Sequence, residues 1–409
     1  MSDHLEHLPP GQRVAWHRVR RGMSQEVLAG LVGRTEDWLS KIENGRAVLD
    51  RVSVIRALAD VLGISVFEII GNESDRFDRS QSRLYPDVNR IRSALTDYTQ
   101  LSPLLAALEA APGPPPLDVL SGDLVAVMTA YQRSEYGRML QSLPALLTQT
   151  QLATRHCHPE QRRRADRLTA LAAQSAAMIL TKLGESDLAW IAAQRGLAAA
   201  EHSEDTAVIG SLLRSVIHAL QSQGRLDDAN AMADRAITYL SRKLDRDSPG
   251  LLSIYGTLLL PAAVAAAKAQ DRTSAQGYLD RAEKTARALG GDANHLWTAF
   301  GPTNVQIHRV TTAMALGDVP VALELIPGID TSGLPTERAI RHALEVVNAY
   351  WARNKIDEAI GELLAAERRA PEQVRTHIMS RQLVMKLRAT TLGRRSRPLA
   401  DLAHRMNVI

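Results

Sequence analysis

The stretch MSQEVLAGLVGRTEDWLSKIENGR, residues 23–46, has the spacing of two short helices joined by a tight turn. Ser24 is a typical N-cap, because its hydroxyl can accept a hydrogen bond from a backbone N–H that lacks a partner within the helix, and Gly33 is a typical helix end. Thr35 supplies a second N-cap two residues later, and Gly45 ends the second helix. The residues that recur at helical spacing, and that we expect to be buried, are Leu28, Leu31, Val32, Leu39 and Ile42. A turn this short makes the helices cross steeply, so the stretch predicts a helix-turn-helix with residues 36–44 as its second helix.

Residues 24–45, together with VIRALADVLGISVFEII at residues 54–70, resemble the lambda-repressor-like, XRE-type helix-turn-helix domain. The landmarks of the resemblance are Gln25, Ala29, Gly33 and the Ile-Glu-Asn-Gly run at residues 42–45. It covers about the first 70 residues and implies a five-helix, all-α head. The further helices that we expect lie at residues 12–21, 53–62 and 65–70. In this family the second helix of the motif enters the major groove of double-stranded DNA.

The resemblance also implies which residues contact DNA. The candidate DNA-binding residues are Gln25, Arg34, Thr35, Glu36, Asp37, Ser40, Lys41 and Arg46. Gln25 and Arg46 would contact phosphates, whereas Glu36, Asp37 and Lys41 would face the edges of bases.

Three acidic residues of the motif affect the expected structure of the head and its expected binding to DNA. Glu43 usually pairs in this family with an arginine of the first helix, which is Arg18 here. Glu36 and Asp37 stand where many relatives carry Gln, Ser or Arg. Carboxylates are repelled by DNA unless they accept hydrogen bonds from cytosine amino groups. They keep open a second class of function, a protein-interaction scaffold whose head does not read DNA specifically.

The composition is that of a globular protein with more than one domain, because the 409 residues are 45% hydrophobic and 23% charged. Residues 1–72 hold nine Lys plus Arg and nine Asp plus Glu, so DNA affinity would depend on where single arginines lie. We find no apolar run of about 18 residues and no signal-peptide pattern. The single Cys157 excludes an internal disulfide framework. These features predict a cytoplasmic protein.

We predict domain boundaries from changes in composition. The head comprises residues 1–72, a linker 73–116, a repeat region 117–393 and a C-terminal tail 394–409. Within the linker, residues 86–111 have apolar side chains spaced by threes and fours, which predicts an amphipathic helix. This helix can dock on the following domain or pair with its copy in a dimer. The run APGPPP at residues 111–116 cannot continue it.

The region after residue 117 is rich in Ala and Leu and is divided by short turns at intervals of roughly 37 to 50 residues, the range of helix-hairpin solenoids. The candidate turns are Ser134-Glu135, Gly184-Glu185, Gly224-Arg225, Asp271-Arg272, Gly317-Asp318 and Asn354-Lys355. The helices that follow them, such as LDDANAMADRAITYL at residues 226–240, resemble the second helices of tetratricopeptide (TPR) repeats. We therefore expect a TPR-like α-solenoid.

A solenoid exposes a concave surface built from the first helix of each hairpin, so polar residues aligned there are candidates for ligand binding. Three helices carry such stripes, and the loop GDANHLWTAFGPTN at residues 291–304 adds an amide-rich, aromatic patch. The candidate ligand-binding residues are Arg214, His218 and Gln221; Asn304, His308 and Thr311; Arg341, Glu345 and Asn348; and Asn294, Trp297 and Phe300. An asparagine amide suits an extended peptide because it both donates and accepts hydrogen bonds. The alternative is that the stripes are solvated faces and that Trp297 caps the core.

Other chemistry has little support in the sequence. Phosphate-loop, nucleophile-elbow and zincin motifs are absent. His156, Cys157 and His158 are adjacent and cannot close a tetrahedral zinc site without further ligands. We expect no cofactor, no metal and no enzymatic activity.

An XRE-type head joined to a TPR-like body resembles the cytoplasmic receptor-regulators of Gram-positive bacteria, in which a signalling peptide in the solenoid groove alters DNA binding. The resemblance implies a homodimeric transcriptional regulator that does not associate with membranes. Its partners would be a double-stranded DNA operator and a peptide or small-molecule effector.

Overall fold

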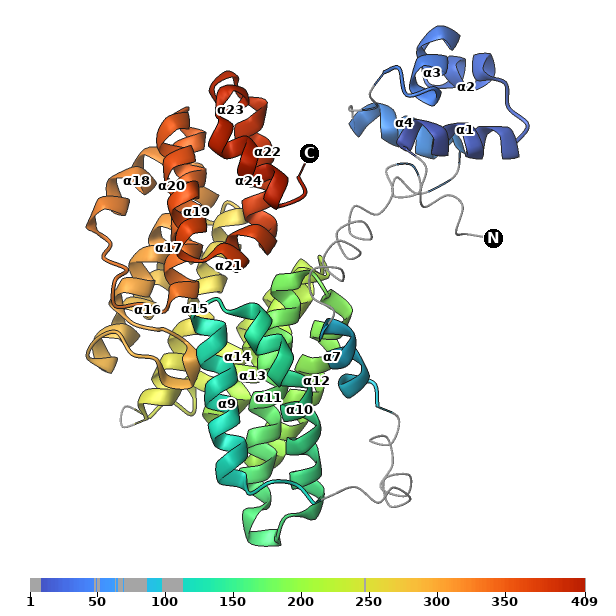
Figure 1. The fold of residues 1–409 in the computed structure, drawn as a ribbon. Coiled ribbons are helices and arrows are strands. Elements are labelled where there is room, and N and C mark those ends of the chain that lie inside the picture. Colours follow the sequence, from blue (N-terminus) through green and yellow to red (C-terminus); the bar gives the residue numbers. More distant parts are fainter. Residues whose placement is uncertain are drawn as a thin grey trace. The chain divides into compact units, whose positions relative to one another are not determined.

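The computed structural model describes residues 9–47, 49, 52–62, 64, 69, 87–97, 113–245 and 248–408, and the regular secondary structure of these residues is helical (Figure 1). The chain divides into two compact units, Met1–Arg83 and Leu84–Ile409. The first unit contains the predicted head, and we keep that name for it; we call the second unit the body. A small helical head followed by many packed helix pairs confirms the predicted all-α fold class.

The head contains α1 Pro10–Arg20, α2 Gln25–Leu31, α3 Glu36–Glu43 and α4 Val52–Leu62. Both predicted N-caps form, because Ser24 Oγ and Thr35 Oγ1 accept hydrogen bonds from the backbone N–H three residues ahead, at 3.1 and 3.2 Å. Gly33 and Gly45 adopt positive φ angles of 68° and 69°, which glycine reaches without the steric cost of a side chain. The helix-turn-helix therefore forms where the sequence predicts it.

The core of the head contains Val14, Leu28, Ala29, Leu39, Ile55, Leu58, Leu62 and Ile69. Leu31 is an exception to the prediction, since it is 59% exposed. The buried side of α2 is centred on Leu28 and Ala29, and Leu31 lies about 200° around the helix from Ala29. The prediction that Leu31 is buried is therefore wrong.

Helix α7, Asp87–Leu95, is the described part of the predicted amphipathic helix, and it belongs to the body. Its apolar side chains Val88, Ile91 and Leu95 are buried, and the helix packs on α10 and α12. Arg92 Nη2 also donates to Glu185 Oε2 at 2.9 Å. This apolar face thus docks on the following helices of the same chain. The rest of that predicted helix at 98–111, most of the predicted helix at 65–70 and the first part of the predicted linker at 73–86 lie outside the described residues.

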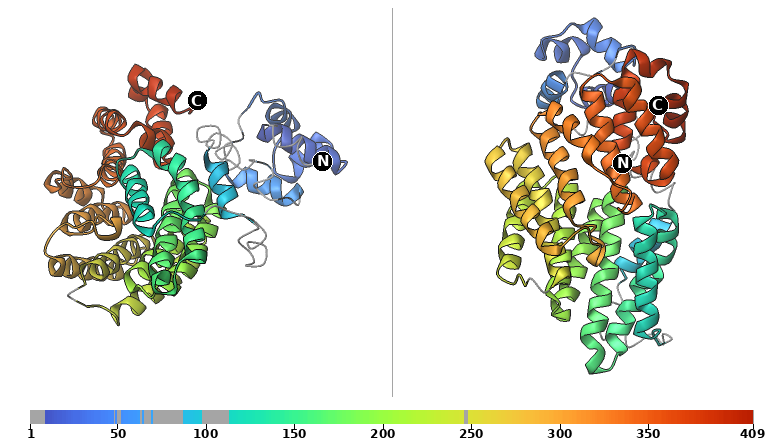
Figure 2. Two further views of the ribbon diagram at one scale, coloured as in Figure 1. Left: turned by 60° about the horizontal axis from the view of Figure 1, so that its bottom comes forward. Right: turned by 90° about the vertical axis from the view of Figure 1, so that its left-hand side faces the viewer.

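The body is built from helix pairs that follow one another along a curved path (Figure 2). The pairs are α9 Leu117–Gln132 with α10 Tyr136–His156, α11 Arg162–Leu183 with α12 Ser186–Ser203, α13 Thr206–Ser222 with α14 Leu226–Ser241, α15 Pro249–Lys268 with α16 Arg272–Leu289, α17 Pro302–Ala315 with α18 Val319–Leu325, and α19 Thr336–Ala352 with α20 Ile356–Arg369. The remaining elements are η2 Pro159–Gln161, η3 His295–Trp297, η4 Ile326–Gly328, α21 Pro371–Thr376, α22 Ile378–Ala389, α23 Thr391–Arg395 and α24 Arg397–Arg405. All six predicted turns fall at the junction between the two helices of a pair, and Arg272 of one turn is already the first residue of α16.

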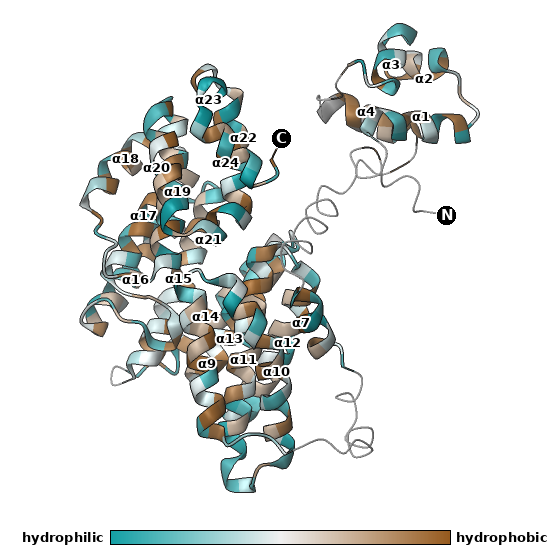
Figure 3. Ribbon diagram, viewed as in Figure 1, coloured by the Kyte–Doolittle hydropathy of each residue, from teal (hydrophilic) through white to brown (hydrophobic). Residues whose placement is uncertain are grey.

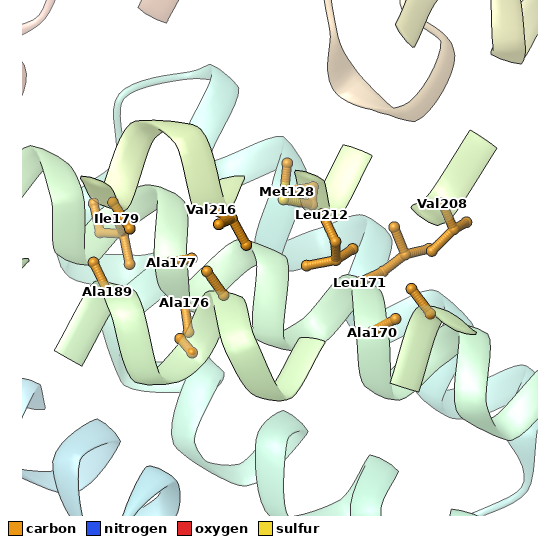
Figure 4. Packing of buried hydrophobic residues seen from close by; sticks show 14 of the residues in the cluster. Met128, Ala170, Leu171, Ala176, Ala177, Ile179, Ala189, Val208, Leu212 and Val216 are labelled. Atoms are coloured by element: carbon orange, nitrogen blue, oxygen red, sulfur yellow. The ribbon is translucent and has the colours of Figure 1, made fainter. Parts of the chain in front are cut away.

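Small residues allow the helices of the body to approach closely. Figure 4 shows alanines of α11 and α12 beside larger side chains of α13 such as Leu212 and Val216. A Cβ atom added to Gly196 of α12 would lie 2.5 Å from Leu212 Cδ1 and 3.1 Å from Ala173 Cβ, so a larger residue here would require these side chains of α13 and α11 to shift. Most body helices carry both apolar and polar residues, as expected for helices with one buried side (Figure 3).

Helix α15 corrects one expectation from composition. Pro249–Lys268 is long and apolar enough to span a membrane by length and composition, and 72% of its most apolar window is buried within the body. The prediction that the chain has no such apolar run is wrong. Because α15 packs against α14, α16 and α17, its apolar surface is accounted for by the core.

The segment predicted as a C-terminal tail is also packed. Helix α24 buries Leu399, Leu402 and Ala403 against the preceding helices. Arg405 Nε and Nη2 donate to the two carboxylate oxygens of Glu367 on α20 at 2.8 and 2.6 Å.

Candidate DNA-binding surface and ligand-binding residues

The end of α3 is fixed to α1 and α2 by a network centred on Glu43. Arg18 Nε donates to Glu43 Oε1 at 2.7 Å, and Arg18 Nη2 donates to Glu43 Oε2 at 2.8 Å. Arg18 Nη1 also donates to the carbonyl oxygen of Met23 at 2.7 Å. The hydrogen bond with Glu43 raises the pKa of Arg18. The structure thus brings together the pair that the family resemblance implies.

Gln25 belongs to the same network, since its Nε2 donates to Glu43 Oε2 at 2.6 Å. The sequence assigned Gln25 to phosphate contact, and that assignment stays a prediction. A second close contact lies nearby, because a Cβ atom added to Gly11 would be 1.9 Å from the carbonyl oxygen of Ile42. Glycine at this position lets α1 approach the end of α3.

The outward side of α3 carries the residues predicted to face bases. Glu36, Asp37 and Lys41 are exposed, whereas Ser40 is half-buried. Lys41 Nζ forms an ion pair with Asp37 Oδ2 at 2.6 Å. The pair joins positions i and i+4, and both side chains are more than half exposed, so it is weak and breaks at little cost.

The remaining predicted DNA contacts surround this face. Thr35 caps α3, and the exposed Arg34 places its guanidinium carbon 5.7 Å from the ring centroid of Trp38. Arg46 is exposed and follows Gly45 at the end of the motif. Arg20 is one of the arginines of the head on whose position we expect DNA affinity to depend, and its guanidinium carbon lies 4.9 Å from the ring centroid of Trp16. An arginine that follows a tryptophan by four residues on a helix predicts such a contact.

Comparison with known proteins agrees with this geometry for the head. A family model described as a helix-turn-helix domain matches residues 11–68. No curated protein matches the chain, and no solved structure matches it. The protein therefore carries an N-terminal helix-turn-helix domain followed by a large all-helical region, and a domain of this kind implies DNA as a partner.

In the body, the loop at residues 291–304 is held by the side-chain amides of Asn294 and of Gln132 at the end of α9. Asn294 and Gln132 exchange two side-chain hydrogen bonds, each of 2.9 Å, and Asn294 Oδ1 also accepts from the backbone N–H of Ala299 at 3.1 Å. Trp297 is half-buried and packs against the core. Phe300 is fully buried, and a Cβ atom added to Gly256 would lie 1.9 Å from its Cζ. Phe300 is therefore a core residue, and its predicted place in a surface patch is wrong.

The stripe on α17 also has internal partners. Asn304 is fully buried, and its Nδ2 donates to the carbonyl oxygen of Ala299 at 2.9 Å. His308 Nδ1 donates to the carbonyl oxygen of Asn304 at 2.9 Å, and Thr311 Oγ1 donates to that of Ile307 at 3.2 Å. Asn304 thus anchors the preceding loop, and its ligand contact stays a prediction.

The stripes on α13 and α19 meet in one group of charged residues, which we call the charged cluster. It consists of Lys182, Arg214, Glu337, Arg338, Arg341 and Glu345. Lys182 Nζ forms an ion pair with Glu337, and Arg341 Nη2 lies 3.2 Å from Glu345 Oε1. Burial alone would raise the pKa of Glu337, but the charges of Lys182 and Arg338 lower it to about 2. Glu337 is therefore ionised at neutral pH.

Two of the predicted histidines lie beside the charged cluster. Burial lowers the pKa of His218 to about 3, and the charges of Arg214 and Arg338 act in the same direction. Burial lowers the pKa of His308 to about 3, and Arg338 again contributes. Both imidazoles are neutral at pH 7, so they add no charge to the cluster.

Sequence reasoning missed Lys182, Glu337 and Arg338 in this group. Lys182 is the single charged residue in the apolar second half of α11, which is a usable signal for a buried functional group. Glu337 and Arg338 lie one helical turn before the predicted Arg341. Asn348 is half-buried farther along α19.

The charged cluster lies where the first and last parts of the body meet. Ser134 Oγ, after α9, donates to Gln373 Oε1 of α21 at 2.6 Å. Gln373 Nε2 in turn donates to the carbonyl oxygen of Glu337 at 3.0 Å. The backbone N–H of Gly137 donates to Glu372 Oε2 at 2.7 Å. These contacts close the curved path of helices on itself.

Proposed function

We propose that this protein is a transcriptional regulator that binds double-stranded DNA in a sequence-specific manner through its head. The observation that carries the proposal is that one side of α3 is held by hydrogen bonds to α1 and α2 while its other side is exposed. Arg18, Glu43 and Gln25 lock the inner end of α3, while Glu36, Asp37 and Lys41 remain exposed. A recognition helix needs both properties, since base contacts require a fixed helix and free side chains.

We further propose that the regulator acts as a homodimer. A single small head covers too little DNA for useful specificity, whereas two heads can read half-sites about 34 Å apart. Because the apolar face of α7 is already covered by α10 and α12, the described part of α7 does not supply that interface through this face.

We propose a TPR-like sensor role for the body, with a peptide or small-molecule effector bound among the first helices of the pairs. Polar residues of α13, α17 and α19 gather there, which supports the assignment. The proposal includes a cytoplasmic location and no enzymatic activity. An effector can regulate DNA binding only if it prefers one arrangement of the two heads in the dimer.

The scaffold alternative is favoured by one observation. On the exposed side of α3, which we call the recognition face, the positive charge of Lys41 is paired with Asp37. Glu36 adds a second carboxylate to this face. Under this alternative, the head binds other proteins and does not read DNA specifically.

A titration of the purified full-length protein with fluorescently labelled genomic duplexes separates the two proposals. A DNA reader shows saturable anisotropy changes whose affinity falls steeply as salt rises, because phosphate contacts release counterions. Arg46→Ala should weaken binding to every duplex, while Arg287→Ala, an exposed arginine of α16 in the body, serves as the matched control. Absence of binding at low salt supports the scaffold and contradicts the regulator.

A further inference from the structure

Two cations of the charged cluster lack a carboxylate partner among the described residues. Lys182 is paired with Glu337, and Arg341 is paired with Glu345. Arg214 on α13 and Arg338 on α19 form no ion pair with any described residue. The Nε atoms of both are buried and have no hydrogen-bond partner in the described part of the chain.

Arg214 is the more deeply placed of the two, with 8% of its surface exposed. Burial lowers the pKa of Arg214, and the like charge of Arg338 acts in the same direction. Tyr131 and Glu337 offset this effect only in part, since the pKa remains lowered. The adjacent His218 is a neutral imidazole at pH 7. A guanidinium cannot neutralise itself by losing a proton under ordinary conditions, so Arg214 is a buried positive charge without an ion-pair partner among the described residues.

Such an arrangement is unfavourable in an isolated protein, because an ionised group removed from water needs a counter-charge or full hydrogen bonding. Unsatisfied buried polar groups are rare in native proteins, and those that persist call for a specific explanation. Arg214 and Arg338 act on each other electrostatically and neither has an ion-pair partner among the described residues, so a single anion would satisfy both guanidiniums. Each guanidinium presents a planar fork of N–H donors that fits a carboxylate or a phosphate.

We propose that Arg214 and Arg338 form the binding site for a compact, doubly charged anionic group of the effector, either a phosphate or a pair of carboxylates. This inference rests on the proposed sensor role of the body and specifies the chemistry of its ligand. Two unpaired positive charges match two negative charges, so the bound state would be electrically balanced.

The position of Arg338 connects this site to the closure of the body. Its neighbour Glu337 pairs with Lys182 of α11 and accepts a hydrogen bond from Gln373 through its carbonyl oxygen. Gln373 also holds Ser134 of the first helix pair. An anion on Arg214 and Arg338 would link α13 to α19 beside these contacts and would stabilise the closed arrangement.

The test uses the full-length protein, with inorganic phosphate as one probe and succinate as the other, at constant ionic strength set with sodium chloride. Thermal unfolding and isothermal titration calorimetry are recorded for the wild type and for Arg214→Met, Arg338→Met and Arg353→Met. Arg353 is the matched control, because it lies exposed at the end of the same α19. A ligand that binds only the folded state raises the unfolding temperature in proportion to its saturation.

We expect at least one probe to raise the unfolding temperature of the wild type and of Arg353→Met in a saturable way. Arg214→Met and Arg338→Met should bind that probe at least about tenfold more weakly, as expected for loss of charge-assisted hydrogen bonds. Without anion, both variants should unfold at the same temperature as the wild type or higher, because each removes a positive charge that has no ion-pair partner among the described residues. This opposite response distinguishes a binding site from a structural role.

The choice of probe identifies the ligand class. A response to phosphate alone assigns a phosphate group, and a response to succinate alone assigns a dicarboxylate. A wild type that responds to neither, or Arg214→Met and Arg338→Met variants that respond like the wild type, overturns the proposal. DNA titrations of the same proteins distinguish failure of this site from failure of the proposed regulator. A wild type that binds DNA normally but binds neither anion refutes this site and leaves the proposed regulator intact.

Discussion

Arg18 and Glu43 form a two-pronged ion pair, with 2.7 Å between Nε and Oε1 and 2.8 Å between Nη2 and Oε2, that joins α1 to the last residue of α3. Only 13% of the Arg18 side chain and 4% of the Glu43 side chain are exposed, so the pair is shielded from solvent. It fixes the inner end of the recognition helix while the outer face stays free. The predictions for the head follow from this division.

Glu43→Gln should destabilise the head by about 3 kcal/mol, because it leaves the guanidinium of Arg18 largely buried without its counter-charge. Hydrogen–deuterium exchange of peptides from α1 to α3 in the full-length protein measures this loss. Asp37→Asn is the control, since it removes an exposed ion pair and should change stability by less than about 0.5 kcal/mol. Equal exchange in Glu43→Gln and the wild type would show that the pair does not hold the head together.

Asp37→Asn should strengthen DNA binding. The change removes a negative charge from the recognition face and releases Lys41, whose Nζ lies 2.6 Å from Asp37 Oδ2. Most of the gain should appear on all duplexes alike, because repulsion of phosphate does not depend on sequence. Glu26→Gln, an exposed carboxylate in the first turn of α2, is the matched control. If Asp37 instead accepts from a cytosine amino group, Asp37→Asn weakens binding to one sequence class, and this outcome refutes the purely repulsive role.

Asn348→Ala should abolish the response of DNA binding to the cognate effector and leave ligand-free folding unchanged, because Asn348 is half-buried on α19. Asn304→Ala should abolish the response too, but it should also lower stability by about 1–3 kcal/mol, since it removes the buried hydrogen bond to the Ala299 carbonyl. Thermal unfolding of both variants, followed by DNA titration with and without effector, tests the difference. A normal effector response in Asn348→Ala removes this residue from the binding site.

The body should lose stability as the pH falls below about 6.5. The pKa of His218 and of His308 is about 3 in the folded protein, against an ordinary value of 6.5, so the unfolded chain binds more protons between these limits. The stabilisation is complete above pH 6.5 and declines with falling pH, by on the order of 2 kcal/mol for each histidine at pH 5. Glu337, with a pKa of about 2, contributes in the same direction only at more acidic pH.

Urea unfolding of the full-length protein at pH 7, 6 and 5 measures this dependence. Positive groups face both histidines, namely Arg214, Arg338 and Lys182 for His218, and Arg338 and Arg341 for His308. His218→Gln should reduce the slope of stability against pH by about one proton, whereas the exposed His404→Gln should not. The same slope in His218→Gln and the wild type would contradict the burial of a neutral imidazole at position 218.

Local features of the fold were predictable from sequence because they depend on neighbouring residues. Ser24 and Thr35 cap their helices, and Gly184, Gly224 and Gly317 adopt positive φ angles at predicted turns. These residue types have few alternative uses in such positions.

Long-range features were less predictable, since helical periodicity does not say which helix faces which. Lys182 and Glu337 are 155 positions apart, and no sequence feature near either residue indicates that the two form a pair. Phe300 lies in a loop of surface-like composition and Asn304 in the first turn of the helix that follows it, but the close approach of α15 at Gly256 makes room for Phe300 in the core. The candidate site was therefore predictable as three polar stripes, while the charged cluster that joins α13 and α19 required the structure.

Within the DNA-binding surface, Lys41→Ala and Arg46→Ala should differ in their effect. Loss of a phosphate contact by Arg46 should weaken binding to all duplexes about equally. Loss of a base contact by Lys41 should relax the preference at one position by roughly 1–3 kcal/mol. Titrations on a preferred duplex and a scrambled duplex compare the two variants. Equal losses for both variants on both duplexes would refute the assignment of Lys41 to base recognition.

The most direct test of the central claim, that the head reads double-stranded DNA by sequence, is selection of duplexes from a random library by the purified full-length protein. The retained duplexes are sequenced after successive rounds, and their affinity is measured at several salt concentrations. The account predicts enrichment of one motif with two related half-sites about 34 Å apart between their centres. A retained pool without any enriched motif, or with no preference over scrambled duplexes at any salt concentration, would contradict it.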